Sequence, residues 1–156
     1  MKRNLKKVDI YTDGACSGNP GRGGWAAILF YNGNKKEISG GINQTTNNRM
    51  EMFSALSALR MLKYPCEVTL YSDSAYLVDA FNKGWIAEWQ RNSWKTASKE
   101  EVKNQDLWKA LLMETVKHRI NFVKVKGHSD NIHNNRCDEL AKAAINRVLP
   151  AEGVNA

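Results

Sequence analysis

The chain has 156 residues, of which 42% are hydrophobic and 25% charged, a composition typical of a globular protein and not of a disordered or fibrous one. No stretch approaches the roughly 20 apolar residues that a membrane-spanning helix needs, and the basic N-terminal residues lack the apolar run of a signal peptide. The formal net charge of +7 favours a polyanionic partner, and we expect no membrane partner.

The cysteines bear on the compartment. Cys16, Cys66 and Cys137 are odd in number and form no dense pattern of the kind that builds a disulfide framework. Such usage is typical of reduced thiols, so we expect a cytoplasmic protein.

Three β-strands are predicted at the start of the chain. The first runs from Val8 to about Asp13, and the next two cover residues 24–31 and 35–43. Between the second and third lies Asn32-Gly33-Asn34, a strong signal for a tight hairpin turn. The three strands are therefore predicted to form an antiparallel meander.

Helices and strands alternate in the remainder of the chain. The predicted elements are a helix in 45–63 capped by Thr or Asn and ended before Pro65, a strand at 67–72, helices at 74–82 and 104–118, a strand at 120–125, and a last helix at 134–149. This order implies a five-stranded mixed α/β sheet, antiparallel on one side and parallel beyond the helical crossovers. No linker or repeat is visible, so we expect a single domain over 1–156 with frayed ends at 1–7 and 150–156.

Two of the predicted strands share a pattern that ends on an acid. Each runs Tyr, then Thr or Ser, then Asp, which places Asp13 and Asp73 at their carboxyl ends. Open α/β sheets bind ligands at that edge, and adjacent parallel strands would bring the two acids side by side. The alternative for each is a turn or capping acid, since Gly14 and Ser74 follow. A glycine-rich phosphate loop after Asp13 is disfavoured, because the spacing G-x-G-x-x-G into a helix is absent.

Two further acids lie on predicted helices. Glu51 shares a helix face with Ala55, Ala58 and Leu62, an apolar stripe that should face the sheet. The alternative is a Glu at the edge of the stripe that reaches water. Asp138 falls early in the last helix, where a favourable interaction with the helix dipole is a sufficient explanation, so this pattern alone leaves Asp138 unassigned.

Acids that cluster need compensation. Two carboxylates about 4 Å apart repel by ~4 kcal/mol even at an effective dielectric constant of ~20. Oxygen ligands without thiolates select Mg²⁺ or Mn²⁺, and pairs of such ions hold the attacking and leaving oxygens of a phosphodiester in line. A zinc site is the alternative, because His128, His133 and Cys137 have a loosely zinc-like spacing. No C-x-x-C partner exists, so Cys137 is better interpreted as part of a buried helix stripe.

Four segments carry these residues in order: "YTDGACSGNPGRGG" with Asp13, "TTNNRMEMFSAL" with Glu51, "YSDSAY" with Asp73, and "VKGHSDNIHNNRCDELA" with His128 and Asp138. Together they resemble the motifs of ribonuclease H type 1 in its bacterial form, over nearly the whole chain. The resemblance implies a ribonuclease H-like fold and an endonuclease that hydrolyses the RNA strand of RNA–DNA hybrids with two Mg²⁺ ions, or Mn²⁺ as a substitute. The four acids would bind the metals, and His128 would assist proton transfer or product departure.

The resemblance also implies substrate-binding residues. These are Asn19 and Asn47 on the RNA and hybrid side of the groove, Thr46 and Asn48 in a pocket for a DNA-strand phosphate, and Trp85 against DNA sugars. Trp85 would belong to a helical protrusion at 83–103, in which we expect Trp89 and Trp94 to pack.

The chain departs from the family pattern at three positions. Ala75 stands where the family often carries a Gln that reaches the minor groove, so one RNA-side contact is expected to be missing. Asp130 and Asn135 replace a Gly and a Glu and alter the charge around the His128 loop.

Two other functions remain as alternatives. One is a non-catalytic module of the same fold that binds hybrids or duplexes, which the presence of all four acids argues against. The other is a related nuclease or strand-transfer domain acting on DNA, which we expect to be accompanied by further domains. We expect the chain to act as a monomer.

Overall fold

A computed structural model describes residues 4–126 and 131–148. The elements in these ranges are β1 (Lys6–Gly18), β2 (Gly21–Tyr31), β3 (Asn34–Thr45), α1 (Asn47–Arg60), β4 (Cys66–Ser72), α2 (Ala75–Asn82), α3 (Trp85–Arg91), α4 (Gln105–Lys117), β5 (Arg119–Lys124) and α5 (Ile132–Asn146). No helix among the described residues is long and apolar enough to cross a membrane.

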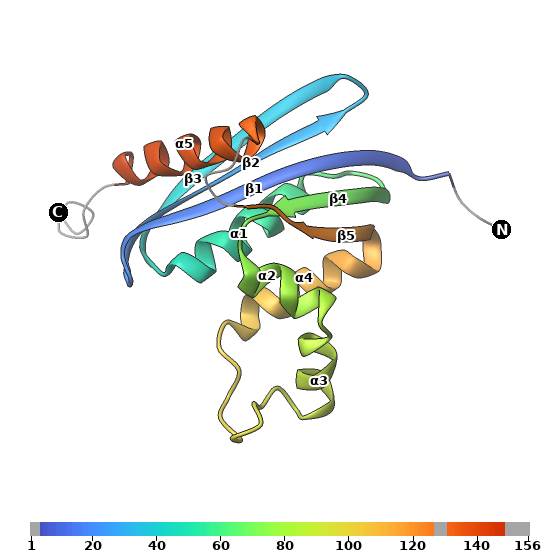
Figure 1. Cartoon of the computed structure of the whole chain (residues 1–156), viewed down its shortest axis with the longest axis vertical. Coiled ribbons are helices and arrows are strands. Elements are labelled where there is room, and N and C mark those ends of the chain that lie inside the picture. Colours follow the sequence, from blue (N-terminus) through green and yellow to red (C-terminus); the bar gives the residue numbers. More distant parts are fainter. Residues whose placement is uncertain (1–3, 127–130, 149–156) are drawn as a thin grey trace.

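The five strands form one sheet in the order β3-β2-β1-β4-β5 (Figure 1). β1, β2 and β3 pair antiparallel, whereas β4 and β5 join β1 in parallel, which confirms the predicted fold class. Asn32 and Gly33 form the turn between β2 and β3 with φ values of 52° and 78°, the positive values that a two-residue hairpin turn requires.

Helices cover both faces of the sheet, and alternation along β2 shows how (Figure 1). Ala27 and Leu29 face the larger apolar core, to which α1 and α4 contribute, whereas Ala26 and Ile28 face α5. A Cβ atom at Gly24 would clash with a backbone carbonyl of α5, so glycine there allows the helix to lie directly on the strand. The sheet is therefore the middle of three layers.

The predicted end of the first strand is wrong. β1 continues to Gly18, because its antiparallel ladder with β2 extends through the segment rich in glycine and small residues. Its parallel ladder with β4 ends earlier, at Tyr11 paired with Tyr71. Asp13 therefore lies inside β1 but just past the end of its pairing with β4, at the edge where ligands bind in parallel sheets.

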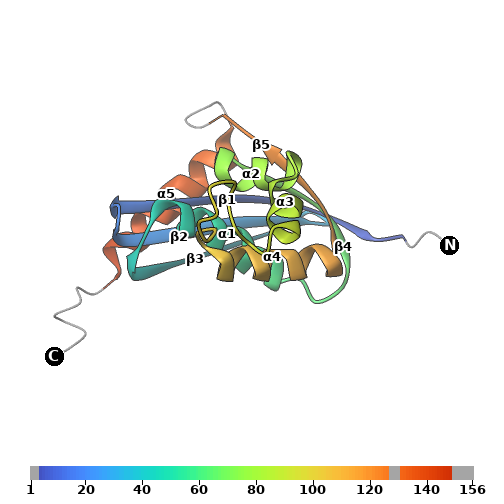
Figure 2. The same cartoon turned by 90° about the horizontal axis from the view of Figure 1, so that it is seen from below.

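The prediction of a helical protrusion over 83–103 holds only for α3. Beyond this helix the chain makes turns in which Ser93, Trp94 and Lys99 have φ values of 56°, 61° and 67°. Positive φ values are incompatible with a right-handed helix, so helical structure cannot continue through these residues. α3 and the loop that follows it lie on the side of the sheet opposite α5 (Figures 1 and 2).

Candidate active site

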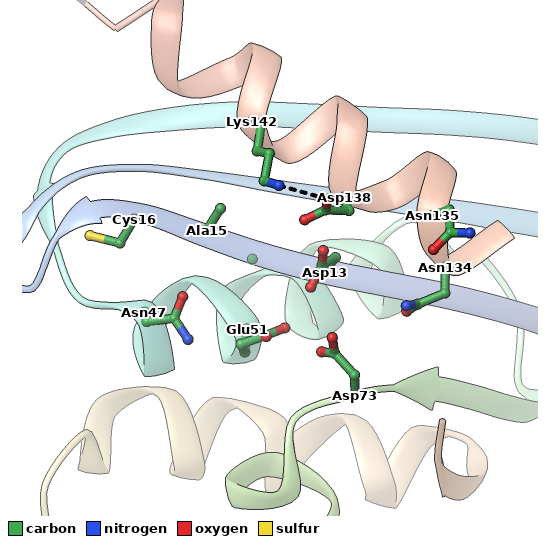
Figure 3. Close-up of a pocket in the computed structure, with 11 residues that line it drawn as sticks. Asp13, Ala15, Cys16, Asn47, Glu51, Asp73, Asn134, Asn135, Asp138 and Lys142 are labelled. Carbon is green, nitrogen blue, oxygen red and sulfur yellow. Dashed lines mark ion pairs between the residues drawn. The ribbon is translucent and has the colours of Figure 1, made fainter. Parts of the chain in front are cut away.

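Three acids converge where β1, β4 and α1 meet (Figure 3). Asp13 lies in β1, Asp73 directly follows β4, and Glu51 lies early in α1. One carboxylate oxygen from each residue lies within 4.8 Å of the others. We refer to Asp13, Glu51 and Asp73 as the acid cluster.

Two local features bring Glu51 to β1. The Thr46 hydroxyl accepts a hydrogen bond of 3.2 Å from the backbone N–H of Arg49 and caps α1. A Cβ atom at Gly14 would lie 2.5 Å from the backbone nitrogen of Glu51, closer than side chains tolerate. Glycine at position 14 therefore lets β1 and α1 approach until Asp13 and Glu51 can meet.

Burial and mutual repulsion favour the protonated forms of these acids. Asp13 is 4% exposed and Glu51 is 5% exposed. Burial, followed by the charge of Asp73, raises the pKa of Asp13 to about 8. Burial and the charges of Asp13 and Asp73 hold the pKa of Glu51 well above its usual range. Ionisation of the whole cluster near neutral pH therefore requires a compensating cation.

The ligand set fits a hard divalent cation. The Oε1 atom of Glu51 is buried and has no hydrogen-bond partner within the described parts of the chain. A buried acceptor without a hydrogen-bond partner destabilises the folded state by ~1–3 kcal/mol. An ion bound to this oxygen would remove that destabilisation. All three side chains offer carboxylate oxygens, the ligands that Mg²⁺ and Mn²⁺ prefer.

Asp138 reaches the same pocket from α5, but its oxygens are not part of the acid cluster. Its side chain is 29% exposed and forms an ion pair of 3.0 Å with the ammonium of Lys142, one helical turn later (Figure 3). A hydrogen bond with Asp138 also contributes to the raised pKa of Asp13. The structure thus brings the fourth predicted acid to the site with a cation already beside it.

The pocket between these elements has a volume of about 290 Å³ and includes two residues that sequence reasoning missed, Asn134 and Lys142. Both lie four residues from Asp138 on α5, and this helical spacing is the signal that could have found them. Asn134 is 2% exposed, projects from α5 toward the pocket, and has an Oδ1 atom without a hydrogen-bond partner in the described ranges (Figure 3).

The zinc alternative receives no support from the geometry. Cys137 is buried against β2, its thiol donates a hydrogen bond of 3.3 Å to the Tyr11 carbonyl, and burial raises its pKa. The His133 ring packs 4.9 Å from that of Tyr11 and 4.6 Å from that of Phe30, measured between centroids. Both side chains therefore serve packing. His128, like Asp130, lies outside the described residues.

Four of the predicted substrate-binding residues lie at or next to the start of α1, and one of them reaches the pocket of the acid cluster. The Asn19 side chain accepts a hydrogen bond of 3.0 Å from the backbone N–H of Asn47 and so connects the β1–β2 turn to the start of α1. Asn47 also lines the pocket. Thr46 caps the helix, and Asn48 is exposed next to it.

Trp85 lies apart from the pocket, at the start of α3. Its ring is half-buried and lies 6.4 Å from that of Trp89. Trp89 and Trp94 pack against the main core, and Trp89 lies 5.6 Å from the buried Trp108 ring. Ala75 is exposed at the first position of α2.

A mixed sheet with a buried, oxygen-only acid cluster at the end of its parallel strands defines a class of α/β proteins with a divalent-cation centre, a type of site suited to phosphate-ester chemistry. The sequence matches the RNase H family over residues 5–146, and the chain belongs to this family. The resemblance seen in its motifs is thereby confirmed.

Curated relatives are similar over almost their whole length. Ribonuclease H of Moorella thermoacetica is 62% identical over 141 residues, which cover 90% of this chain and 93% of that protein. Ribonuclease H of Caldanaerobacter subterraneus subsp. tengcongensis is 60% identical over 147 residues, which cover 94% and 96%.

Solved structures show the same fold. LC9-RNase H1, described as a type 1 RNase H with the type 2 active-site motif, aligns with a TM-score of 0.84 at 25% identity, over 97% of this chain and 77% of that one. LC11-RNase H1 in complex with an RNA/DNA hybrid aligns with a TM-score of 0.68 at 25% identity, over 90% and 97%.

Proposed function

We propose that this chain is a metal-dependent endoribonuclease that hydrolyses the RNA strand of RNA–DNA hybrids. The observation that carries the proposal is the buried acid cluster with an unpartnered oxygen on Glu51. Membership of the ribonuclease H family supports the reaction, and the related LC11-RNase H1 bound to a hybrid supports the substrate class.

Asp13, Glu51, Asp73 and Asp138 would hold two Mg²⁺ ions, with Mn²⁺ as a substitute. When bound, such ions lower the pKa of a coordinated water and neutralise charge on the reacting phosphate. Because the pKa of Asp13 is raised to about 8 and that of Glu51 is held well above its usual range, an ion that binds these carboxylates would displace protons. Ion uptake should therefore be weaker at acidic pH.

The remaining predicted residues would position the substrate and move protons. Asn19 and Asn47, joined by their hydrogen bond, would hold the RNA strand at the acid cluster. Thr46 and Asn48 would contact a phosphate of the DNA strand, and Trp85 would pack against its sugars, where a flat ring leaves little room for a 2′-hydroxyl. His128 would assist proton transfer, a role for which imidazole side chains are suited because they gain and lose protons near physiological pH.

A panel of four substrates tests this proposal: RNA–DNA hybrid, double-stranded RNA, double-stranded DNA and single-stranded RNA, each with Mg²⁺. We expect internal cuts in the RNA strand of the hybrid alone, loss of cleavage with chelator, and recovery with Mg²⁺ or Mn²⁺. The Asp73→Asn variant should be inactive. Asp9→Asn is its matched control, because Asp9 is an exposed acid on the neighbouring strand β1.

The panel also separates the alternatives. Cleavage of duplex DNA at a comparable rate would indicate a DNA nuclease, and binding of the hybrid without cleavage would indicate a non-catalytic module. Activity of Asp73→Asn close to that of Asp9→Asn would contradict the metal assignment. We further propose that the chain acts as a cytoplasmic monomer with a single domain, which analytical ultracentrifugation of the full chain can test for the oligomeric state.

A further inference from the structure

Lys142 is the only cationic side chain among the described residues that line the pocket around the acid cluster. Its ammonium lies 3.0 Å from an oxygen of Asp138, and the two residues are one turn apart on α5. A carboxylate that precedes a lysine by four residues is the favourable arrangement of such a pair on a helix. The pair therefore has the geometry to persist in solution.

Because of this ion pair, Lys142 competes with any cation that binds the carboxylate of Asp138. Asp13, Glu51 and Asp73 are within reach of one another without Asp138, whereas Asp138 contacts Asp13 from α5 and is also paired with the ammonium of Lys142. A divalent ion that takes Asp138 as a ligand must displace the ammonium and tolerate a positive charge beside it. Both effects weaken binding on the Asp138 side of the pocket.

We propose that Lys142 is a positioning residue that competes with a divalent cation for the carboxylate of Asp138 and thereby lowers the affinity of the free chain for divalent cations. This inference rests on the proposed function, because it takes Asp138 to be a metal ligand. The Lys142 side chain is 62% exposed, so its replacement removes the ion pair without opening a cavity in the core. An exposed pair of this kind changes an equilibrium by up to about fivefold.

Calorimetric titration with Mn²⁺, without nucleic acid, tests the inference. Lys142→Met should bind Mn²⁺ up to about fivefold more tightly than the wild type, whereas Lys142→Arg, which keeps the pair, should stay within about twofold. Lys36→Met is the matched control for loss of one positive charge, because Lys36 is exposed on β3, two strands away from Asp13, and its dissociation constant should equal that of the wild type.

The Asp138→Asn background separates competition for Asp138 from general repulsion of cations. In this background Lys142→Met should have no further effect on the dissociation constant, because the group for which the ammonium and the ion compete is gone. An undiminished effect there, or equal constants for wild type and Lys142→Met, would overturn the role of Lys142 while leaving the nuclease proposal intact. Failure of the wild type to bind Mn²⁺ would overturn both.

Discussion

Asp13→Asn should stabilise the chain in a solution free of divalent cations. Asn preserves the size of the side chain and removes one charge from a cluster in which Asp73 and Glu51 repel it. The pKa of Asp13 is raised from an ordinary value of 3.8 to about 8. The stability that this carboxyl contributes is therefore complete below pH 3.8 and is lost as the pH rises through 8.

The expected gain is about 3 kcal/mol at pH 9. Two unit charges 4.8 Å apart, the upper limit for separations within the acid cluster, interact by about 3.5 kcal/mol at an effective dielectric constant of ~20. The pKa of Asp13 sets an upper limit of about 6 kcal/mol, at 1.36 kcal/mol for each pH unit between 3.8 and 8. Because the neighbouring acids share the repulsion, the single-pair value is the better guide. For a chain of this size it corresponds to a rise in Tm of about 6–12 °C.

Thermal unfolding followed by circular dichroism, with chelator present, measures this gain. At pH 5 Asp13 is still protonated in the folded chain but already ionised in the unfolded one, so the gain in Tm from Asp13→Asn should be present but smaller than at pH 9. At pH 9 the variant should unfold several degrees higher. Asp9→Asn removes an exposed charge from the same strand and should change Tm little at either pH.

Equal Tm values for wild type and Asp13→Asn at pH 9, or a gain of the same size at pH 5, would refute this reasoning, because the gain should grow as the pH rises from 3.8 to about 8. Added Mn²⁺ gives a second check. It should raise the Tm of the wild type more than that of the variant, since a ligand that binds the folded state more tightly stabilises it more.

Three further predictions concern packing, substrate and proton transfer. Gly14→Ala should destabilise the chain by about 1–3 kcal/mol in urea unfolding and abolish cleavage, because its Cβ would push Glu51 away; unchanged stability would contradict the close approach. Trp85→Ala should weaken binding to an uncleavable hybrid without changing the salt dependence of its dissociation constant, and a changed slope would indicate lost phosphate contacts instead. His128→Ala should lower single-turnover cleavage about 10²-fold or less, whereas loss as complete as in Asp73→Asn would assign His128 an indispensable role.

The sheet could be predicted from the sequence because its signals are local. The Asn32-Gly33 turn defines the first hairpin, and the crossover helices imply parallel pairing of the later strands. The end of β1 could not be predicted, because pairing with β2 overrides the weak strand propensity of the segment after Asp13. In the protrusion, Ser93 and Trp94 adopt positive φ values. Neither residue type favours such values, so the sequence does not predict these turns.

The site divides in the same way. The convergence of Asp13 and Asp73 could be predicted because two strands end in the same pattern. The position of Glu51 at the site could be predicted because this acid lies on an apolar helix face. The roles of Asn134 and Lys142 depend on how α5 is rotated about its axis and how closely it lies on the sheet. Both are properties of three-dimensional packing that helical spacing alone does not determine.

Two of the four acids come from the sheet itself and the other two from helices on its opposite faces, so different contacts hold different acids in place (Figure 1). Asp13, Glu51 and Asp73 are fixed by the core between the sheet and α1, which must tolerate their mutual repulsion. Asp138 depends instead on α5, which lies directly on β2 because Gly24 has no side chain. Lys142 offsets part of the charge that Asp138 brings to the site, although this charge still contributes to the raised pKa of Asp13. The site therefore combines three acids held by the main core with a fourth acid that α5 brings in together with a lysine.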